Sequence, residues 1–481
     1  MSKALSAGEP QKHPSVGTSL CGAVRWNAET AARNRAWSQP ASDRAPARGS
    51  PVAVLGRNVG TACIRHLCIS AVVLVAATAL CASLAEPPRG PLLKNYRLVA
   101  VLVVSGVAIA AASFAQPRFT PIPASTLLAG SPLHVPLDGI DPSGQALTYT
   151  VVVSDPLVTA TVVAGSRSLR IQVATYGTMV FQLFDGRVRR VTNRIATLAD
   201  SGFYNGVIFH RIINDFVIQG GDPTGTGAGG SSLGNFDDKF HVDLQHNRTG
   251  LLSMAKAADD TNDSQFFITA GVQRHLDFNH SIFGLLIEGE SVRQRISNVA
   301  VDPNNGDRPL ADVVMESVST FVDTQNAVLM LKAPEGATSA VDVTVTVQNT
   351  SGASTSQTFR VNVTPDTIDS PPFLADIPEI TTPIDTTVTY QLVARDVEGN
   401  PALYLDQSAM TANGLPVPLQ APLTMQYTVD FNTGLLTIFP TAGIRGPQRI
   451  AVATAASPNA VDYQVVTVVV GAPPEEPTTS P

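Results

Sequence analysis

The stretch FHRIINDFVIQGGDPTGTGAGG, residues 209–230, places His210 beside Arg211 in an apolar run and ends in a glycine-rich loop. Its last glycines satisfy the spacing G-x-G-x-x-G, which is typical of loops that bind phosphate at a helix N-terminus. That spacing indicates a phosphate site only where the loop leads from a strand into a helix. The segment SSLGNFDDKF that follows has no helical period. We therefore interpret the glycines as a loop beside a binding groove.

Hydrolysis is a second chemistry that the residue types allow. Ser253, His210 and Asp222 are the three side-chain types of a catalytic triad, in which a histidine activates a serine and a carboxylate orients the histidine. In one large class of such enzymes the serine is presented on a sharp turn between a strand and a helix, and no such elbow surrounds Ser253. Hydrolysis is therefore not favoured.

The elements that must position these residues are mostly strands. GTMVFQLF, residues 177–184, alternates as a strand, and in the segment VTNRIATLADSG the apolar residues Val191, Ile195 and Leu198 recur at helical spacing before Gly202. Further strand-like runs follow, and HSIFGLLIEGESVRQRIS predicts a strand that leads into a second helix. A mainly β segment with two helices predicts a barrel capped at its ends.

Short β-branched runs separated by turn signals lie on both sides of this segment. About four strands are predicted between residues 128 and 175, and about three between residues 326 and 364. Neither piece alone has enough strands for a sandwich, but together they reach the seven of an immunoglobulin-like fold. We predict one split β-sandwich, residues 128–175 plus 319–365, with an inserted domain at 176–318, because insertion at an exposed loop tip is tolerated.

A second immunoglobulin- or cadherin-like β unit is predicted at residues 370–471, where strands and turns recur at similar spacing. The turn phrases DPSGQ and DVEGN stand at similar places in the two units. Their acidic residues could bind Ca²⁺, but carboxylates in turns more often hydrogen-bond their own backbone. We therefore do not favour a calcium site.

The N-terminal part of the chain predicts export. Residues 1–66 and the tail 472–481 have compositions typical of disorder. Residues 67–85 are apolar and just long enough to span a bilayer. Residues 94–115 combine a charged start, an apolar run and a small-residue end, which is typical of a signal peptide or membrane anchor. Either interpretation places residues 116–481 outside the cytoplasm, in the periplasm or at the cell surface.

The charge is distributed unevenly along the chain. The first 97 residues carry twelve Lys/Arg and four Asp/Glu, a net charge of +8 that leaves −15 for the rest of a chain whose total is −7. An acidic remainder argues against nucleic-acid binding, because phosphate contacts need clustered Lys and Arg. All four cysteines lie within the first 81 residues, so the later residues can form neither a disulfide nor a thiolate site.

Three separated blocks resemble the cyclophilin family of peptidyl-prolyl cis/trans isomerases, in the short-looped form common in bacteria. They are FHRIINDFVIQGGDPTGTG, LLSMAKAADDTNDSQFFIT and HLDFNHSIFGLLIEG, in the order that the family has them. The resemblance covers roughly residues 176–298, under a third of the chain. It implies a mainly β fold, an eight-stranded barrel capped by two helices, here inserted in or flanked by the sandwich domains.

The resemblance also implies roles for individual residues. Arg211 matches the catalytic arginine, Gln219 the residue that orients it, and Phe216 a wall of the proline pocket that belongs to the same catalytic set. The residues that match the substrate groove are His210, Val217, Ala255, Lys256, Ala257, Gln265, Phe267, His275, Leu276 and His280. The family uses no cofactor, and its loop that corresponds to Asp259, Asp260 and Asp263 binds no metal. A solvated turn is therefore expected there.

An X-Pro amide is held planar by resonance and isomerises over a barrier of about 20 kcal/mol. A fixed cationic donor beside the amide nitrogen, next to an apolar pocket for the proline ring, would stabilise the twisted transition state without breaking any bond. We predict an exported isomerase that assists the folding of proline-containing polypeptides. The alternative is an adhesion or scaffold protein whose cyclophilin-like insert binds such segments with little turnover.

Overall fold

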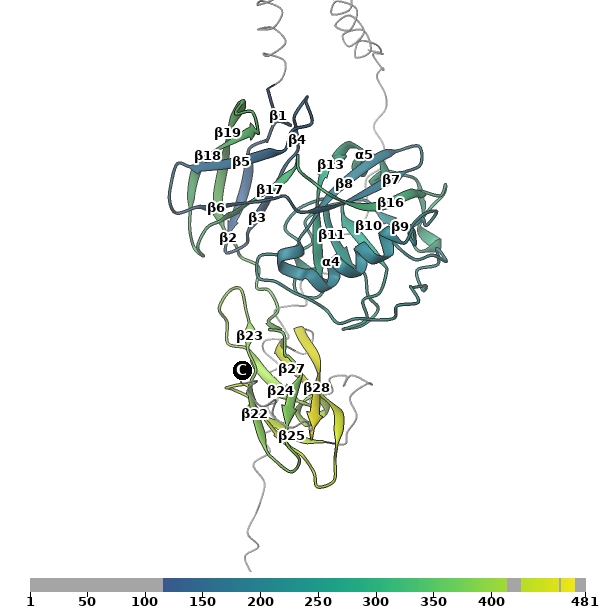
Figure 1. Ribbon diagram of the computed structural model, residues 1–481, viewed down its shortest axis with the longest axis vertical. Helices are drawn as coiled ribbons and strands as arrows, with labels where there is room; N and C mark the ends of the chain where they lie inside the picture. Colours follow the sequence, from purple (N-terminus) through teal and green to yellow (C-terminus); the bar gives the residue numbers. More distant parts are fainter. Residues whose placement is uncertain (1–115, 413–424, 458–459, 472–481) are drawn as a thin grey trace, which may run out of the picture. The chain divides into compact units, whose positions relative to one another are not determined.

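The computed structural model describes residues 116–412, 425–457 and 460–471 (Figure 1). The predicted N-terminal segments, 1–66, 67–85 and 94–115, and the tail 472–481 lie outside the described residues. Within the described part of the chain, no helix is long and apolar enough to cross a bilayer.

An eight-stranded antiparallel sheet forms the central domain. Its strands, in the order in which they pair, are β16 (Met315–Val322), β7 (Arg167–Val173), β8 (Gly177–Leu183), β13 (Ile282–Glu288), β11 (Leu251–Met254), β12 (Phe266–Thr269), β10 (Val217–Gly220) and β9 (Phe209–Ile213). The two edge strands also meet, because Ile208 beside β9 bridges Val314 beside β16. The sheet therefore curls and closes on itself, as the predicted barrel requires.

Two helices pack on this sheet, as predicted (Figure 1). Helix α4 (Asp185–Asp200) lies against β13 and β16, and α5 (Glu290–Ser297) lies against β8, β9 and β10. The apolar positions of α4 that recur at helical spacing are buried. The remaining short elements of the domain are η1 (Arg274–Leu276), β14 (Val301–Asp302), η2 (Pro303–Asn305) and β15 (Arg308–Pro309).

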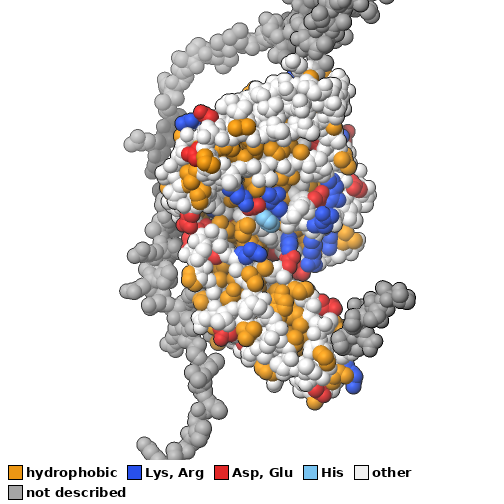
Figure 2. All heavy atoms as spheres, turned by 60° about the vertical axis from the view of Figure 1, so that its left-hand side comes forward, with side chains coloured by type: hydrophobic (Ala, Val, Ile, Leu, Met, Phe, Trp, Pro, Cys, Tyr) orange, Lys and Arg blue, Asp and Glu red, His pale blue; other side chains and the backbone are white. Residues whose placement is uncertain are grey.

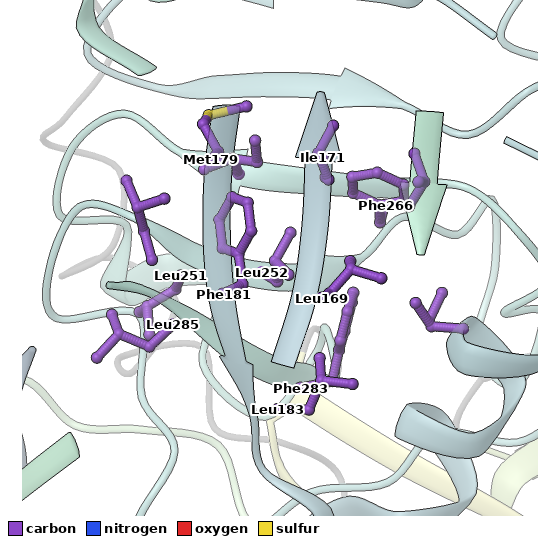
Figure 3. Packing of buried hydrophobic residues seen from close by; sticks show 14 of the residues in the cluster. Leu169, Ile171, Met179, Phe181, Leu183, Leu251, Leu252, Phe266, Phe283 and Leu285 are labelled. Carbon is purple, nitrogen blue, oxygen red and sulfur yellow. The ribbon is translucent and has the colours of Figure 1, made fainter. Parts of the chain in front are cut away.

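The core of this domain fills the space enclosed by the sheet. Phe181, Leu252 and Phe266, from β8, β11 and β12, point toward one another there (Figure 3). The labelled side chains are Leu169, Ile171, Met179, Phe181, Leu183, Leu251, Leu252, Phe266, Phe283 and Leu285, all of them buried. Because alternate side chains of a strand face opposite sides, β7 and β8 contribute every second residue to this core, whereas Leu251 and Leu285 lie on the other face of the sheet from Leu252. The packed core holds the strands that carry the site in fixed positions.

Strands from both sides of the central domain pair with each other. One sheet has the order β3 (Leu133–Leu137), β17 (Ala327–Lys332), β6 (Thr159–Ala164), and the other has the order β2 (Ser125–Ala129), β19 (Ser354–Pro365), β18 (Ser339–Asn349), β5 (Leu147–Val153). A short pair, β1 (Arg118–Phe119) and β4 (Gly139–Ile140), accompanies them. Strands that precede and follow the central domain in sequence thus share sheets, while the split sandwich and its immunoglobulin-like identity stay predictions.

The predicted boundary of the insert is wrong by one strand at its start. The run LRIQV was assigned to the split sandwich, but it lies in β7, which pairs with β8 and β16 of the central sheet. The physical reason is burial: Leu169, Ile171 and Val173 are fully buried in the core of the central domain. The seventh strand of the flanking sheets is instead β2, which the sequence analysis did not identify.

A third group of strands follows. One sheet has the order β21 (Ile380–Thr382), β28 (Ala460–Val470), β27 (Gly446–Ser457), β24 (Leu403–Asp406), and another has the order β22 (Val388–Gln391), β26 (Leu435–Phe439), β25 (Gln426–Val429). A short pair, β20 (Phe373–Leu374) and β23 (Ala394–Arg395), and helix α6 (Gln407–Ala412) complete it. The unit is mainly β, as predicted, and its immunoglobulin- or cadherin-like identity stays a prediction.

The flanking sheets offer a direct test of the insertion. Ala164 at the end of β6 pairs with Ala327 at the start of β17, so the insert enters and leaves at neighbouring positions. Deletion of residues 166–322 would leave Gly165 and residues 323–326 as a hairpin loop, a length that hairpins accept. We expect the shortened protein to keep cooperative urea unfolding, followed by circular dichroism. A broad, non-cooperative transition would contradict the insertion.

Candidate active site

Arg211 and Gln219 lie opposite each other on neighbouring strands. Strands β9 and β10 are antiparallel and pair Arg211 with Gln219. Directly opposite residues of an antiparallel pair project to the same face of the sheet, so the two side chains meet. Nη1 of Arg211 donates a hydrogen bond of 3.3 Å to Oε1 of Gln219. Both side chains are half-buried, which leaves the guanidinium within reach of a ligand.

Gln265 extends this pair into a network. Nε2 of Gln219 donates to Oε1 of Gln265 at 3.1 Å, and Nε2 of Gln265 donates to the carbonyls of Gly227 and Gly229 at 2.9 Å each. The glycine-rich loop therefore lies against the polar side of the site. This contact gives the loop a structural function that needs no phosphate.

A small apolar cluster, which we call the proline pocket, lies beside the guanidinium. Val217, Phe267 and Leu276 are buried in it, and Phe216 and Ala255 pack against them half-buried. The cluster is separate from the main core of the domain. Cζ of Arg211 lies 5.6 Å from the centroid of the Phe216 ring. A positive charge beside an apolar pocket is the arrangement that the predicted chemistry requires.

The three histidines predicted in the groove differ in their surroundings. The exposed ring of His275 stacks on Phe216, with centroids 5.8 Å apart. The ring of His280 meets Phe267 edge-on at 5.6 Å, and its Nδ1 lies 2.9 Å from the carbonyl of Met254, to which it donates. Burial lowers the pKa of His280 to about 4, so the ring is neutral at neutral pH. Burial also lowers the pKa of His210, which is 7% exposed.

The neutral state of His280 predicts a pH dependence of stability. Because its folded pKa of about 4 lies below the ordinary value of 6.5, the unfolded chain takes up this proton first as the pH falls. His280 therefore costs stability between about pH 6.5 and pH 4, with a slope of up to about 1.4 kcal/mol per pH unit. We expect His280→Gln to lose this part of the slope in urea unfolding measured from pH 4 to 7. An unchanged slope would contradict the assignment.

The segment around Lys256 is held by ion pairs. Nζ of Lys256 contacts Asp238, and it lies 2.8 Å from Asp259. The lysine side chain is only 4% exposed, so its charge is not available to a substrate. The backbone N–H of Ala255 donates to the carbonyl of Gln265 at 2.9 Å, which fixes this edge of the groove. Ala257 is exposed, and the main chain at 255–257 is the part left for a ligand.

Asp259 and Asp260 lie in a turn, but the carboxylates of the acidic cluster are half-buried rather than fully solvated. Asp263 separates from the other two, since it pairs with Arg194 at 3.2 Å and accepts a hydrogen bond from the N–H of Ser231 at 2.6 Å. Asp259 and Asp260 instead lie near Asp238, and the three carboxylates are close enough to share a cation. Lys256 already neutralises two of them. Burial, helped by the charge of Asp259, raises the pKa of Asp260 to about 8.

The two turn phrases also differ in the structure. Asp141 of DPSGQ accepts hydrogen bonds from the N–H groups of Ser143 and Gln145, the turn chemistry that was predicted. Asp396 of DVEGN accepts one from the N–H of Asn400 at 2.9 Å. Its carboxylate also forms a group with those of Asp369 and Glu398 that is close enough to hold a cation. The prediction against calcium therefore stays a prediction.

Ser253 has different partners from those considered in the sequence. Its Oγ lies 3.0 Å from Nε2 of His246, whose Nδ1 lies 3.1 Å from Oδ1 of Asp277. The three residue types of a triad are thus present, but none of the three residues is exposed and a substrate could not reach the serine. The His246 ring stacks on Phe267 with centroids 6.1 Å apart. The group supports the floor of the proline pocket.

Eight of the sixteen other arginines in the described part of the chain form an ion pair with a carboxylate. On helix α4, Arg187 lies 3.3 Å from Asp243 and Arg190 lies 2.7 Å from Asp237. Figure 2 shows one face of the molecule on which Asp and Glu side chains lie among the Lys and Arg side chains. The guanidinium of Arg211 hydrogen-bonds to an amide instead, and no carboxylate among the described residues forms an ion pair with it.

Comparison with known proteins agrees with this geometry. Residues 168–320 match the family of cyclophilin type peptidyl-prolyl cis-trans isomerases. The peptidyl-prolyl cis-trans isomerase ppi1 of Schizosaccharomyces pombe is 48% identical over 136 residues, which are 28% of this chain and 86% of that protein. The human peptidyl-prolyl cis-trans isomerase-like 1 is 45% identical over 139 residues, which are 28% of this chain and 82% of that protein.

Among solved structures, a cyclophilin type isomerase of Cryptosporidium parvum is 36% identical, with a TM-score of 0.31, and the match covers 33% of this chain and 98% of that one. The chain belongs to the cyclophilin family through residues 168–320. It is a peptidyl-prolyl cis-trans isomerase of the cyclophilin type. The relatives named here are eukaryotic, and the short bacterial form stays a prediction.

Proposed function

We propose that Arg211 is the catalytic residue of this isomerase and acts on X-Pro bonds of exported polypeptides. The single observation that supports this role is its guanidinium, held by Gln219 beside the proline pocket. In that position its N–H groups can donate to an amide nitrogen that loses conjugation as the amide twists. The donor is preorganised, so the interaction is stronger in the transition state than in the planar ground state.

The groove residues would bind either the proline ring or the backbone of the substrate. The proline ring would occupy the pocket formed by Val217, Phe267 and Leu276, with Phe216 as a wall and His275 stacked behind it. Gln265 and the main chain at 255–257 would hold the substrate backbone, and His210 and His280 would stay neutral beside it. No cofactor or metal takes part, because rotation about a single amide bond needs neither.

A rate comparison tests the proposed function. We expect the full chain to accelerate cis-to-trans conversion of a proline tetrapeptide far above the uncatalysed rate in a protease-coupled assay. Binding of the peptide without acceleration would favour the scaffold alternative. Export is a separate part of the proposal, which rests on the apolar segments at 67–85 and 94–115. Protein sequencing of the mature N-terminus, together with cell fractionation, would test it, and an uncleaved cytoplasmic chain would contradict it.

A further inference from the structure

The carboxylate of Asp222 accepts hydrogen bonds from several backbone N–H groups of the glycine-rich loop. The residue follows β10 and is fully buried. Its Oδ1 accepts the backbone N–H of Thr224 at 2.7 Å, and its Oδ2 accepts the backbone N–H groups of Thr226, Gly227 and Gly229 at 3.0, 2.7 and 3.1 Å. Burial alone would raise the pKa of this carboxyl, but the hydrogen bonds outweigh burial and hold the pKa well below its usual range. The group is therefore an ionised acceptor.

The same two glycines are held from their other side. The carbonyls of Gly227 and Gly229 each accept a hydrogen bond from Nε2 of Gln265 at 2.9 Å. Asp222 thus fixes the N–H groups and Gln265 meets the C=O groups of the same two residues. The position of the two carbonyls depends on the buried carboxylate.

These carbonyls determine which way two amide side chains point. An amide NH₂ group only donates and its oxygen only accepts, so two facing carbonyls require the NH₂ end of Gln265. The Oε1 end of Gln265 is then left for Gln219, which must donate through its own Nε2. The Oε1 of Gln219 is in turn presented to Nη1 of Arg211. A continuous chain of hydrogen bonds therefore links Asp222 to the guanidinium.

The carboxylate of Asp222 lies so close to the loop backbone that a side chain larger than that of glycine does not fit at residue 229. A Cβ atom at Gly229 would collide with Oδ1 of Asp222 and would lie 2.8 Å from Oγ1 of Thr224. Gly227 has a φ of +85°, a conformation that favours glycine. The hydrogen bonds that the loop makes with Asp222 and Gln265 thus explain why the loop is rich in glycine.

We propose that Asp222 is a positioning residue for the isomerase reaction, which acts through the loop to orient Gln265, Gln219 and finally Arg211. The proposal rests on the proposed function of Arg211. We therefore expect that loss of the carboxylate lowers the turnover rate while the proline pocket still binds its ligand. Val217, Phe267 and Leu276 take no part in the hydrogen bonds that link Asp222 to Arg211.

The variant Asp222→Asn tests this proposal. An amide in place of the carboxylate points an NH₂ donor at a backbone N–H in either of its orientations, so the loop must shift. Misplacement of a reacting group by about 1 Å can cost about 100-fold. We expect kcat/KM for a proline tetrapeptide to fall by about 10- to 100-fold, while the Kd of the peptide in an NMR titration changes by less than about twofold.

The matched control is Asp323→Asn. Asp323 is also buried, at 4% exposure, and also accepts backbone N–H groups, those of Gln325 and Asn326 at 3.0 Å each, but it lies outside the chain of hydrogen bonds to Arg211. We expect its kcat/KM to stay within about twofold of the wild-type value, since turn anchoring alone does not orient the guanidinium.

A double-mutant cycle with Arg211→Ala separates positioning from a general structural effect. If Asp222 acts through Arg211, Asp222→Asn should cause little further loss in the Arg211→Ala background. An equal loss in both backgrounds, or wild-type activity of a folded Asp222→Asn variant, would overturn the proposal. Wild-type activity of Arg211→Ala would instead overturn the proposed function on which it rests.

A second pair of variants keeps the proposal testable if Asp222→Asn does not fold. Gly229→Ala would displace the carboxylate of Asp222 and crowd Oγ1 of Thr224, and it should lower kcat/KM in the same way. Gly186→Ala is its control, because no atom lies within 4 Å of a Cβ built at that position. Equal activities of these two folded variants would overturn the proposal.

Discussion

Arg211→Ala should lower kcat/KM for a proline tetrapeptide by about 100- to 1,000-fold, the effect typical of removing one preorganised donor from a transition state. The guanidinium donates to Gln219 at 3.3 Å and lies beside the proline pocket. Because the apolar pocket is untouched, the Kd of the peptide should change much less than the turnover rate. A protease-coupled assay and an NMR titration measure the two quantities.

The matched control for this prediction is Arg170→Ala. Arg170 also projects from a strand and also has its guanidinium over a phenylalanine, with Cζ 4.3 Å from the centroid of the Phe321 ring. Its loss should leave kcat/KM within about twofold of the wild-type value, as surface substitutions away from a site usually do. Equal activity of the two arginine variants would contradict the assignment of Arg211.

Phe267→Ala should weaken both substrate binding and the fold. Phe267 is 4% exposed, and its ring forms part of the proline pocket and stacks on the buried His246. Truncation of a buried phenylalanine costs about 3–5 kcal/mol of unfolding free energy. Loss of the pocket floor should also weaken peptide binding by about 10- to 150-fold, because burying a side chain of that size contributes roughly 1.5–3 kcal/mol.

Phe283→Ala separates the two effects of that prediction. Phe283 is fully buried in the main core and lies outside the proline pocket. The variant should lose a comparable unfolding free energy in urea but, at a temperature where it stays folded, bind the peptide like the wild type. Normal peptide binding by folded Phe267→Ala would contradict the proposed pocket.

The roles of Arg211 and Gln219 were implied by the family resemblance, whose motifs are local in the sequence, and these roles stay predictions. The structure adds that the two residues lie opposite each other on neighbouring strands. The helices were also predictable, since Val191, Ile195 and Leu198 face one side of α4. Runs of this kind determine which residues are buried together without information from distant parts of the chain.

Other features depend on contacts that no local pattern contains. The run in β7 is rich in β-branched and apolar residues, and such a run does not specify which sheet it joins. The pairing of His246 with Asp277 spans 31 residues. The role of Asp222 rests on the backbone conformation of a loop, although the order Asp-Pro-Thr is a known turn signal that could have pointed to it.

The most direct test of the central claim is two-dimensional NMR exchange spectroscopy on a proline tetrapeptide with substoichiometric protein. We expect exchange cross-peaks between the cis and trans forms with the wild type, and exchange that is at least about 100-fold slower with folded Arg211→Ala. Absence of exchange with the wild type, or equal exchange with both proteins, would contradict it.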